Sequence, residues 1–168
     1  ACRDTIHVKG TLDGALSLAS LTKDVFIEDN VIYENQNVTT SNDVLGLLSE
    51  RNVVVVDNAA NNSNCEINGS IFTRTGSFTA QNYNNVSPVH ANPLYGTLKI
   101  LGSIVQNTRG PVGTISGSTL VTGFSKRYRY DDRLADPSFR PPFYPLYLVK
   151  TYAITNWWES YRVPNINQ

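Results

Sequence analysis

The feature that most constrains the fold is a short phrase that occurs three times along the chain. Each copy reads apolar residue, any residue, glycine, serine or threonine, apolar residue, and a second glycine follows a few residues later. The copies are Val8–Leu12, Ile67–Ile71 and Ile100–Ile104. Strand phrases that recur at intervals of a few dozen residues are typical of chains that bury their apolar faces by stacking successive turns.

A second repeat lies between the first two copies. Leu16–Ser20 followed by Lys23–Ile27 is echoed by Leu45–Ser49 followed by Arg51–Val55, at nearly the same internal spacing. The phrases are rich in β-branched residues and end at Gly, Asn or Asp, and no long segment keeps a helical apolar stripe. The sequence therefore predicts an all-β chain with few helices, folded as a parallel β-solenoid (β-helix) of a few coils.

Glycines at matching places in the repeats predict the corners of these coils. Gly10, Gly69 and Gly102 each follow two residues of a strand phrase. Glycine tolerates positive φ without steric cost, so we expect the chain to bend at all three.

The chain divides into two parts of one domain. Residues 1–110 carry the repeats and are expected to form the solenoid coils. Residues 111–168 contain both tryptophans and most of the tyrosines, and we expect an extended aromatic wrap that ends in a covering strand at Thr151–Trp158.

Composition excludes a strongly charged binding protein and favours an extracellular setting. The 168 residues hold 14 Lys plus Arg and 14 Asp plus Glu, so no overall field attracts nucleic acid or anionic lipid. No apolar run approaches the roughly 20 residues of a membrane span, so no membrane insertion by this segment is expected. Because the chain begins Ala1-Cys2-Arg3, we interpret it as a processed or excised domain.

The two cysteines, Cys2 and Cys65, could form a disulfide. Cys65 opens a strand phrase in the place that Ile6 occupies near the N-terminus, so stacked phrases could bring the two thiols together. The alternative is an inert, buried Cys65 and a frayed Cys2. No Cys or His spacing suggests a metal site.

Several segments of the chain resemble a family of bacterial surface proteins. They are Leu45–Ser49, Asn52–Val55, Gly102–Thr114, Gly123–Asp131, Pro141–Pro145 and Trp157–Glu159. These segments are similar to prepilin-like, pilus-associated proteins that include minor pilins of the ComZ type. The resemblance implies a right-handed β-solenoid displayed extracellularly at the bacterial cell surface, with pilus or cell-envelope proteins as partners. It implies no catalytic residue and no cofactor.

The candidate ligand-binding residues are Arg127, Tyr128, Arg129 and Tyr130, flanked by Lys126 and Arg133. Guanidinium groups bind phosphates and aromatic rings stack bases, so this strip could bind DNA. In an extended chain the two arginines share one face and the two tyrosines share the other. Alternatively, the tyrosines pack on the solenoid while the arginines pair with Asp131, Asp132 or Asp136.

Catalytic chemistry has little support in the sequence. The solenoid carboxylates are few and do not recur as a pair, and the only histidines, His7 and His90, lie far apart. These carboxylates are Glu28, Asp29, Asp57 and Glu66. We therefore expect no catalytic residue, no metal and no cofactor.

The sequence predicts a non-enzymatic display or adhesion module of a pilus or bacterial envelope, able to capture DNA or a glycan. Aromatic residues between Phe139 and Tyr147 could stack sugars or a partner, or cover the solenoid flank. One alternative is a structural solenoid that assembles end to end into a filament. Another is a β-helix enzyme that cleaves polysaccharides.

Overall fold

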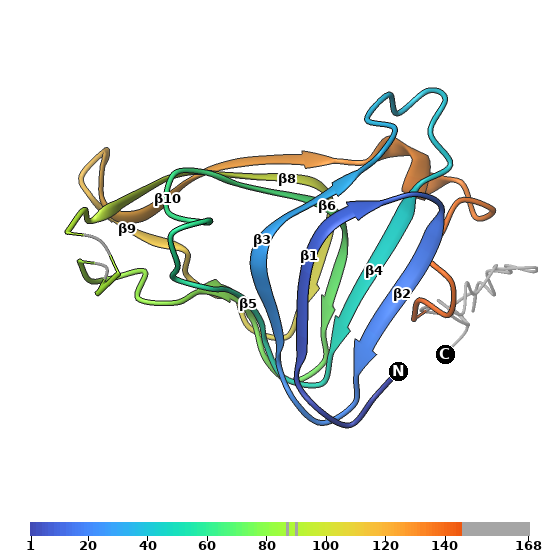
Figure 1. The fold of residues 1–168 in the computed structure, drawn as a ribbon, viewed down its shortest axis with the longest axis horizontal. Coiled ribbons are helices and arrows are strands. Elements are labelled where there is room, and N and C mark those ends of the chain that lie inside the picture. Colours follow the sequence, from blue (N-terminus) through green and yellow to red (C-terminus); the bar gives the residue numbers. More distant parts are fainter. Residues whose placement is uncertain (87, 90, 146–168) are drawn as a thin grey trace, which may run out of the picture.

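The computed structural model describes residues 1–86, 88–89 and 91–145. Within them the chain forms ten strands and one short 3-10 helix, η1 (Asp132–Ala135) (Figure 1). The strands are β1 (Ile6–Leu12), β2 (Ala15–Ser20), β3 (Val25–Tyr33), β4 (Val44–Ser49), β5 (Val53–Val55), β6 (Cys65–Thr73), β7 (Phe78–Ala80), β8 (Leu94–Gln106), β9 (Gly113–Ser116) and β10 (Thr119–Tyr130). No helix among the described residues is both long enough and apolar enough to cross a bilayer.

All ten strands belong to one mixed sheet, which corrects the predicted fold class. Neighbours follow the order β7-β5-β3-β6-β8-β10-β9, with β1 beside β3 and with β4 between β2 and β6. β9 and β10 are antiparallel, whereas the other pairs are parallel. The sheet curls nearly closed, like a barrel, so the prediction of a right-handed parallel β-solenoid is wrong (Figure 1).

A tight turn at Gly117 and Ser118 is the physical reason for this difference. It connects β9 to β10 through two residues, and Gly117 has a φ of +61°. Two-residue loops that begin with glycine reverse the chain into an antiparallel hairpin. The repeat phrases do not extend into this region. The hairpin lies in the segment that was expected to wrap around the coils, so the repeats did not predict it.

Two of the repeats form strand pairs in register, whereas the first copy, Val8–Leu12, pairs with β3 and not with Ile67–Ile71. Leu16 to Ser20 lie beside Leu45 to Ser49, and Gly69 lies beside Gly102. Positive φ at the three repeat glycines is confirmed, with values of +112° at Gly10, +155° at Gly69 and +154° at Gly102. A Cβ added at Gly102 would collide with the carbonyl oxygen of Gly69, so this close approach requires glycine.

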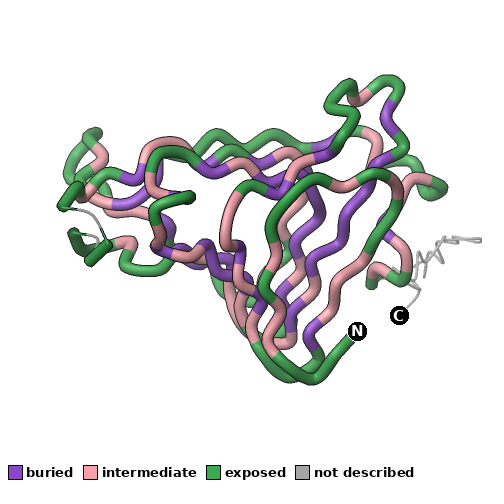
Figure 2. Tube along the Cα trace, in the orientation of Figure 1, coloured by how far each residue is buried: buried purple, intermediate pink, exposed green. Residues whose placement is uncertain are grey.

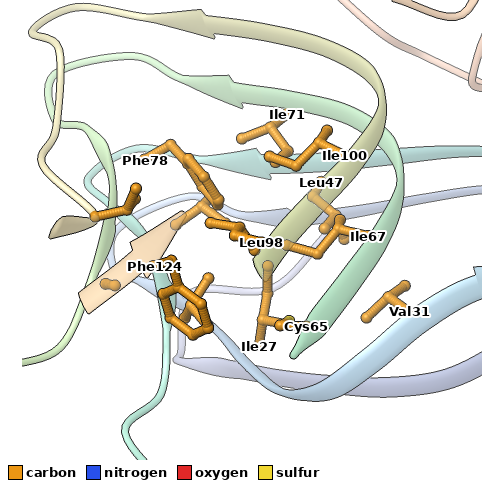
Figure 3. Close-up of a cluster of buried hydrophobic side chains, with 14 of the residues drawn as sticks. Ile27, Val31, Leu47, Cys65, Ile67, Ile71, Phe78, Leu98, Ile100 and Phe124 are labelled. Carbon is orange, nitrogen blue, oxygen red and sulfur yellow. The ribbon is translucent and has the colours of Figure 1, made fainter. Parts of the chain in front are cut away.

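The core is a set of apolar ladders across neighbouring strands. Val25, Val53 and Phe78 stand side by side on β3, β5 and β7, and each is at most 2% exposed. Figure 2 shows the buried positions gathered in the middle strands of the sheet, whereas β1 and the end of β10 are largely exposed. Figure 3 shows core side chains that come from β3, β4, β6, β7, β8 and β10. Full burial of each such side chain stabilises the fold by about 1.5–3 kcal/mol.

The possible disulfide between Cys2 and Cys65 is not formed, and both cysteines are free. Cys2 is exposed, and its backbone forms an isolated parallel β-bridge with Ser20 at the end of β2. Cys65 begins β6 and is fully buried. β3 lies between β1 and β6, and β4 lies between β2 and β6. Two strand spacings are about 10 Å, beyond the reach of a disulfide. Burial raises the pKa of the Cys65 thiol to about 12, with smaller contributions from Asp29 and Glu66, so the thiol stays protonated.

A row of small residues crosses the outer side of four strands. The segment that follows η1 packs against this row. Ser17, Gly46, Ser70 and Ser103 occupy matched positions on β2, β4, β6 and β8. A Cβ added at Gly46 would lie 2.9 Å from Pro141 Cβ and 3.1 Å from Tyr144 Cδ2, so the row leaves room for both side chains. The expected covering strand Thr151–Trp158 lies outside the described residues.

Candidate functional site

The candidate residues Arg127 to Tyr130 form the last part of β10. Between Ser125 and Tyr130 this strand pairs with β8 alone among the described residues, because β9 stops opposite Gly123. All six residues from Ser125 to Tyr130 are exposed. Within the described part of the chain, the end of β10 is therefore open along one edge.

The two arginines line one groove, on the outer side of the sheet. In the register of β10 with β8, Arg127 lies beside Lys99 and Arg129 beside Leu101. The groove has a volume of about 400 Å³ and is closed on another side by the loop after β3. Its lining residues are Gln36, Asn37, Val38, Glu66, Asn68, Lys99, Ile100, Leu101, Arg127 and Arg129.

Positive charge exceeds negative charge in this groove. Lys99 Nζ lies 3.5 Å from Glu66 Oε2, which balances one cation with the only carboxylate in the lining. Neither guanidinium of Arg127 or Arg129 takes part in an ion pair or side-chain hydrogen bond within the described residues. Two adjacent cations are thus available to an anionic ligand.

Asn68 contributes a polar group of a different kind. This residue is only 2% exposed, and its Oδ1 atom meets no hydrogen-bond partner among the described residues. A buried polar atom without a partner costs about 1–3 kcal/mol. The unsatisfied acceptor therefore lies beneath the floor of the groove and is not on its surface.

The two tyrosines alternate with the arginines along β10. Tyr128 lies beside Ile100, is itself 43% exposed, and has a pKa raised by partial burial. Tyr130 is 51% exposed and lines a second pocket, of about 370 Å³, with Arg140 and Tyr144. Arg129 also lines a pocket of about 390 Å³ together with Tyr128 and Tyr130. The structure therefore brings these three candidate residues to one surface, while Arg127 and Arg129 share the groove.

Lys126 faces the core side of β10. It lies beside Leu98, which is fully buried, and its pKa is lowered by burial and by the nearby charge of Arg109. A charge that points inward on an edge strand opposes pairing with another chain. Lys126 is thus separated from the groove although it is next to Arg127 in the sequence.

Arg133 is part of a buried cluster and not of the predicted ligand-binding strip. Its Nη2 lies 2.7 Å from Asp131 Oδ2, and its Nη1 donates to the carbonyl oxygen of Ser41 at 2.9 Å. The guanidinium carbon also lies 4.4 Å from the ring centroid of Phe139 and 5.5 Å from that of Tyr33. Asp131 is thereby occupied by Arg133, and it does not pair with Arg127 or Arg129.

Tyr33 and Asp43 complete this cluster, which the sequence did not reveal. Burial raises the pKa of Tyr33 to about 12. Burial also raises the pKa of Asp43, but hydrogen bonds from the backbone N–H groups of Gly14 and Asn35 outweigh it, so the pKa is lowered overall. The Asp-x-Arg spacing of residues 131–133 was the only local signal, because the other members come from distant parts of the chain.

The carboxylates considered for catalysis are engaged separately. Glu28 lies 2.5 Å from Nδ1 of the exposed His7, and Asp57 accepts hydrogen bonds from Asn62 and Asn82. Glu66 belongs to the groove described above. Within the described part of the chain no group of three His, Cys, Asp or Glu side chains is placed to hold a metal ion. His90 lies outside the described residues.

Comparisons with protein-family models, with curated proteins and with solved structures find no match for this chain.

Proposed function

We propose that the protein is a non-enzymatic binding module that holds a polyanionic chain in the groove between β8, β10 and the loop after β3. The observation that carries the proposal is the pair Arg127 and Arg129, which share one groove and have no ion-pair partner within the described residues. DNA and acidic polysaccharides share the relevant chemistry, which is a regular series of anionic groups.

The groove suits such a chain better than it suits a single anion. Residues two apart on a strand project from the same face about 7 Å apart, a spacing similar to that between successive charges of an extended polymer. Guanidinium groups bind phosphate and carboxylate through paired hydrogen bonds. Because the overall charge is zero, attraction is confined to this groove and does not extend over the surface.

The setting that we propose is the bacterial cell surface, with pilus or cell-envelope proteins as partners. It is supported by the resemblance of Gly123–Asp131 and the other quoted segments to pilus-associated proteins. In this setting the module captures extracellular polymers and carries out no chemistry on them.

The test is a binding assay with the full chain. Labelled single- and double-stranded DNA and an acidic polysaccharide, polygalacturonate, are titrated across a salt series. We expect salt-sensitive binding of at least one polymer, and a loss of about tenfold or more in Arg127→Ala/Arg129→Ala. The slope of log affinity against log salt should fall by about 2 for DNA when two phosphate contacts are lost.

A matched control removes the same charge elsewhere. Lys9 and Lys23 are exposed and lie away from the groove, so Lys9→Ala/Lys23→Ala should leave binding almost unchanged. Binding of no polymer at low salt, or an equal loss in the control, would overturn the proposal.

A further inference from the structure

The last part of β10 leaves one row of backbone hydrogen-bonding groups open. β8 covers one side of this part, and β9 ends before it begins. The N–H group of Asp131 donates to the carbonyl oxygen of Gly102 on β8, and the backbone groups of successive strand residues point to alternate edges. The N–H and C=O groups of Lys126, Tyr128 and Tyr130 therefore point away from β8, where no strand of the described residues pairs with them.

Such a row is a template for a further strand, because its spacing of donors and acceptors matches that of another polypeptide backbone. We propose that the open edge of β10 binds an extended acidic peptide segment of another protein, which adds one strand to the sheet. This contact goes beyond the proposed function. Its partner is held through backbone N–H and C=O groups, and neither DNA nor a polysaccharide presents a row of such groups at strand spacing.

The charges along this edge indicate an acidic partner. Lys126, Arg127 and Arg129 lie on consecutive or alternate positions of the edge strand, and none of them forms an ion pair among the described residues. A strand with Asp or Glu opposite the two arginines gains favourable cross-strand pairs, whereas a basic strand meets all three cations with like charge.

A second copy of this chain is a poor occupant of the same edge. Two copies of β10 side by side would bring cations together without any anion. The other strands that have a single neighbour within the described part of the chain contain no carboxylate; they are β1, β2, β7 and β9. Lys126 opposes pairing with such neutral or basic strands, and only an acidic strand offsets its charge.

The pocket of about 390 Å³ beside this edge specifies the other half of the peptide's pattern. It is lined in part by Tyr128 and by Ile100 and Ile104 of β8. Successive side chains of a strand point to opposite faces. A strand whose carboxylates meet Arg127 and Arg129 therefore presents the residues between them to this pocket. The partner segment should alternate acidic and apolar residues.

The test uses the full chain and synthetic peptides as long as the open edge. The first peptide alternates glutamate with valine, the second is the same peptide with its backbone amides N-methylated, and the third has lysine in place of glutamate. Because N-methylation removes the backbone donors and keeps every charge, we expect the first peptide to bind about tenfold or more tightly than either of the others. Equal affinity for the methylated and unmodified peptides would overturn the proposal.

Hydrogen exchange of backbone amides locates the bound peptide. The amides of Lys126, Tyr128 and Tyr130 should exchange fast in the free chain and slow by about tenfold or more with peptide, whereas those of Arg127 and Arg129, which face β8, should change little. Slow exchange of the first three amides in the free chain would show that the chain itself already covers the edge. Slow exchange only at high protein concentration would show that a second copy does. Either result overturns the proposal.

One variant separates this proposal from the proposed function. Tyr128 lines the pocket but not the groove, so Tyr128→Thr should weaken the acidic peptide severalfold and leave DNA and polygalacturonate unchanged. Threonine is β-branched and suits a strand, so the edge itself is kept. If the methylated peptide binds as well as the unmodified one, strand addition fails and polyanion binding stands. If the peptide binds and neither polymer does, the proposed function fails and strand addition stands.

Discussion

Two arginine environments six residues apart show how differently the same side chain can be used. Arg133 has a side chain 14% exposed and is held by Asp131, by the Ser41 carbonyl and by two aromatic rings. Arg127 is exposed in a groove and has no ion-pair partner within the described residues. A buried cation must be satisfied by the protein itself, whereas an exposed cation can be satisfied by a ligand. The first environment should therefore control stability and the second should control binding.

The largest effect expected from this comparison is on stability. Arg133→Ala leaves the Asp131 carboxylate, 2% exposed, buried without its partner, which should lower the free energy of unfolding by about 3–5 kcal/mol. Urea denaturation followed by far-ultraviolet circular dichroism measures the loss, with Arg127→Ala as the control. Equal unfolding midpoints for the two variants would break the distinction.

A smaller effect concerns the pH dependence of the same cluster. Because the folded pKa of Asp43 is lowered, its contribution to stability is complete above the unfolded value of about 3.9 and is lost as pH falls through the folded pKa. Asp43→Asn should cost about 1–3 kcal/mol at neutral pH, and this difference from the unmodified protein should shrink below about pH 4. The free energy of unfolding of both proteins is measured from pH 2.5 to pH 7, in steps of about half a pH unit. A difference that stays constant with pH would show that the ionised carboxylate is not what stabilises the cluster.

Lys126 sharpens the comparison, because it is a cation that neither pairs in the cluster nor lines the groove. Lys126→Val removes a charge that faces the core side beside Leu98, so the folded chain should change in stability by less than about 1 kcal/mol. The open edge of β10 should then self-associate more readily. Sedimentation velocity at increasing concentration measures this, and Lys126→Arg is the control. Association by the unmodified chain at the same concentrations would instead support the filament alternative.

The smallest effect should be that of the groove arginines on folding. Arg127→Ala/Arg129→Ala should change the free energy of unfolding by no more than about 0.5 kcal/mol, since both side chains are exposed. Thermal unfolding measures it beside the binding assay. A larger loss would mean that these arginines stabilise the sheet, and reduced binding could then not be assigned to the groove.

Local strand pairing was predictable from the sequence, but the overall architecture was not. Repeated phrases identify which strands lie side by side because matching residues fill matching places, as for Gly69 and Gly102. Gly117-Ser118 is a sequence typical of a two-residue hairpin turn, but it lies outside the repeats. The repeats alone therefore overstated how uniformly parallel the sheet is.

The candidate site was predicted in part. Alternation along a strand predicts that Arg127 and Arg129 share one face, and both do line the groove, but Arg129 also lines a pocket with Tyr128 and Tyr130. The contributions of Lys99, Asn68 and the loop after β3 depend on which strands meet across the sheet. Arg133 was misplaced because Ser41 and Tyr33, which hold it, lie some ninety residues away or more.

The row of small residues beneath Pro141 and Tyr144 limits which side chains the four strands can carry there. Ser17, Gly46, Ser70 and Ser103 belong to four different strands but shape one surface. A larger side chain at Gly46 would meet Pro141 Cβ at 2.9 Å and displace the segment that carries Arg140 into the second pocket. The shape of the second pocket therefore depends on small side chains that lie on four strands far from it in the sequence.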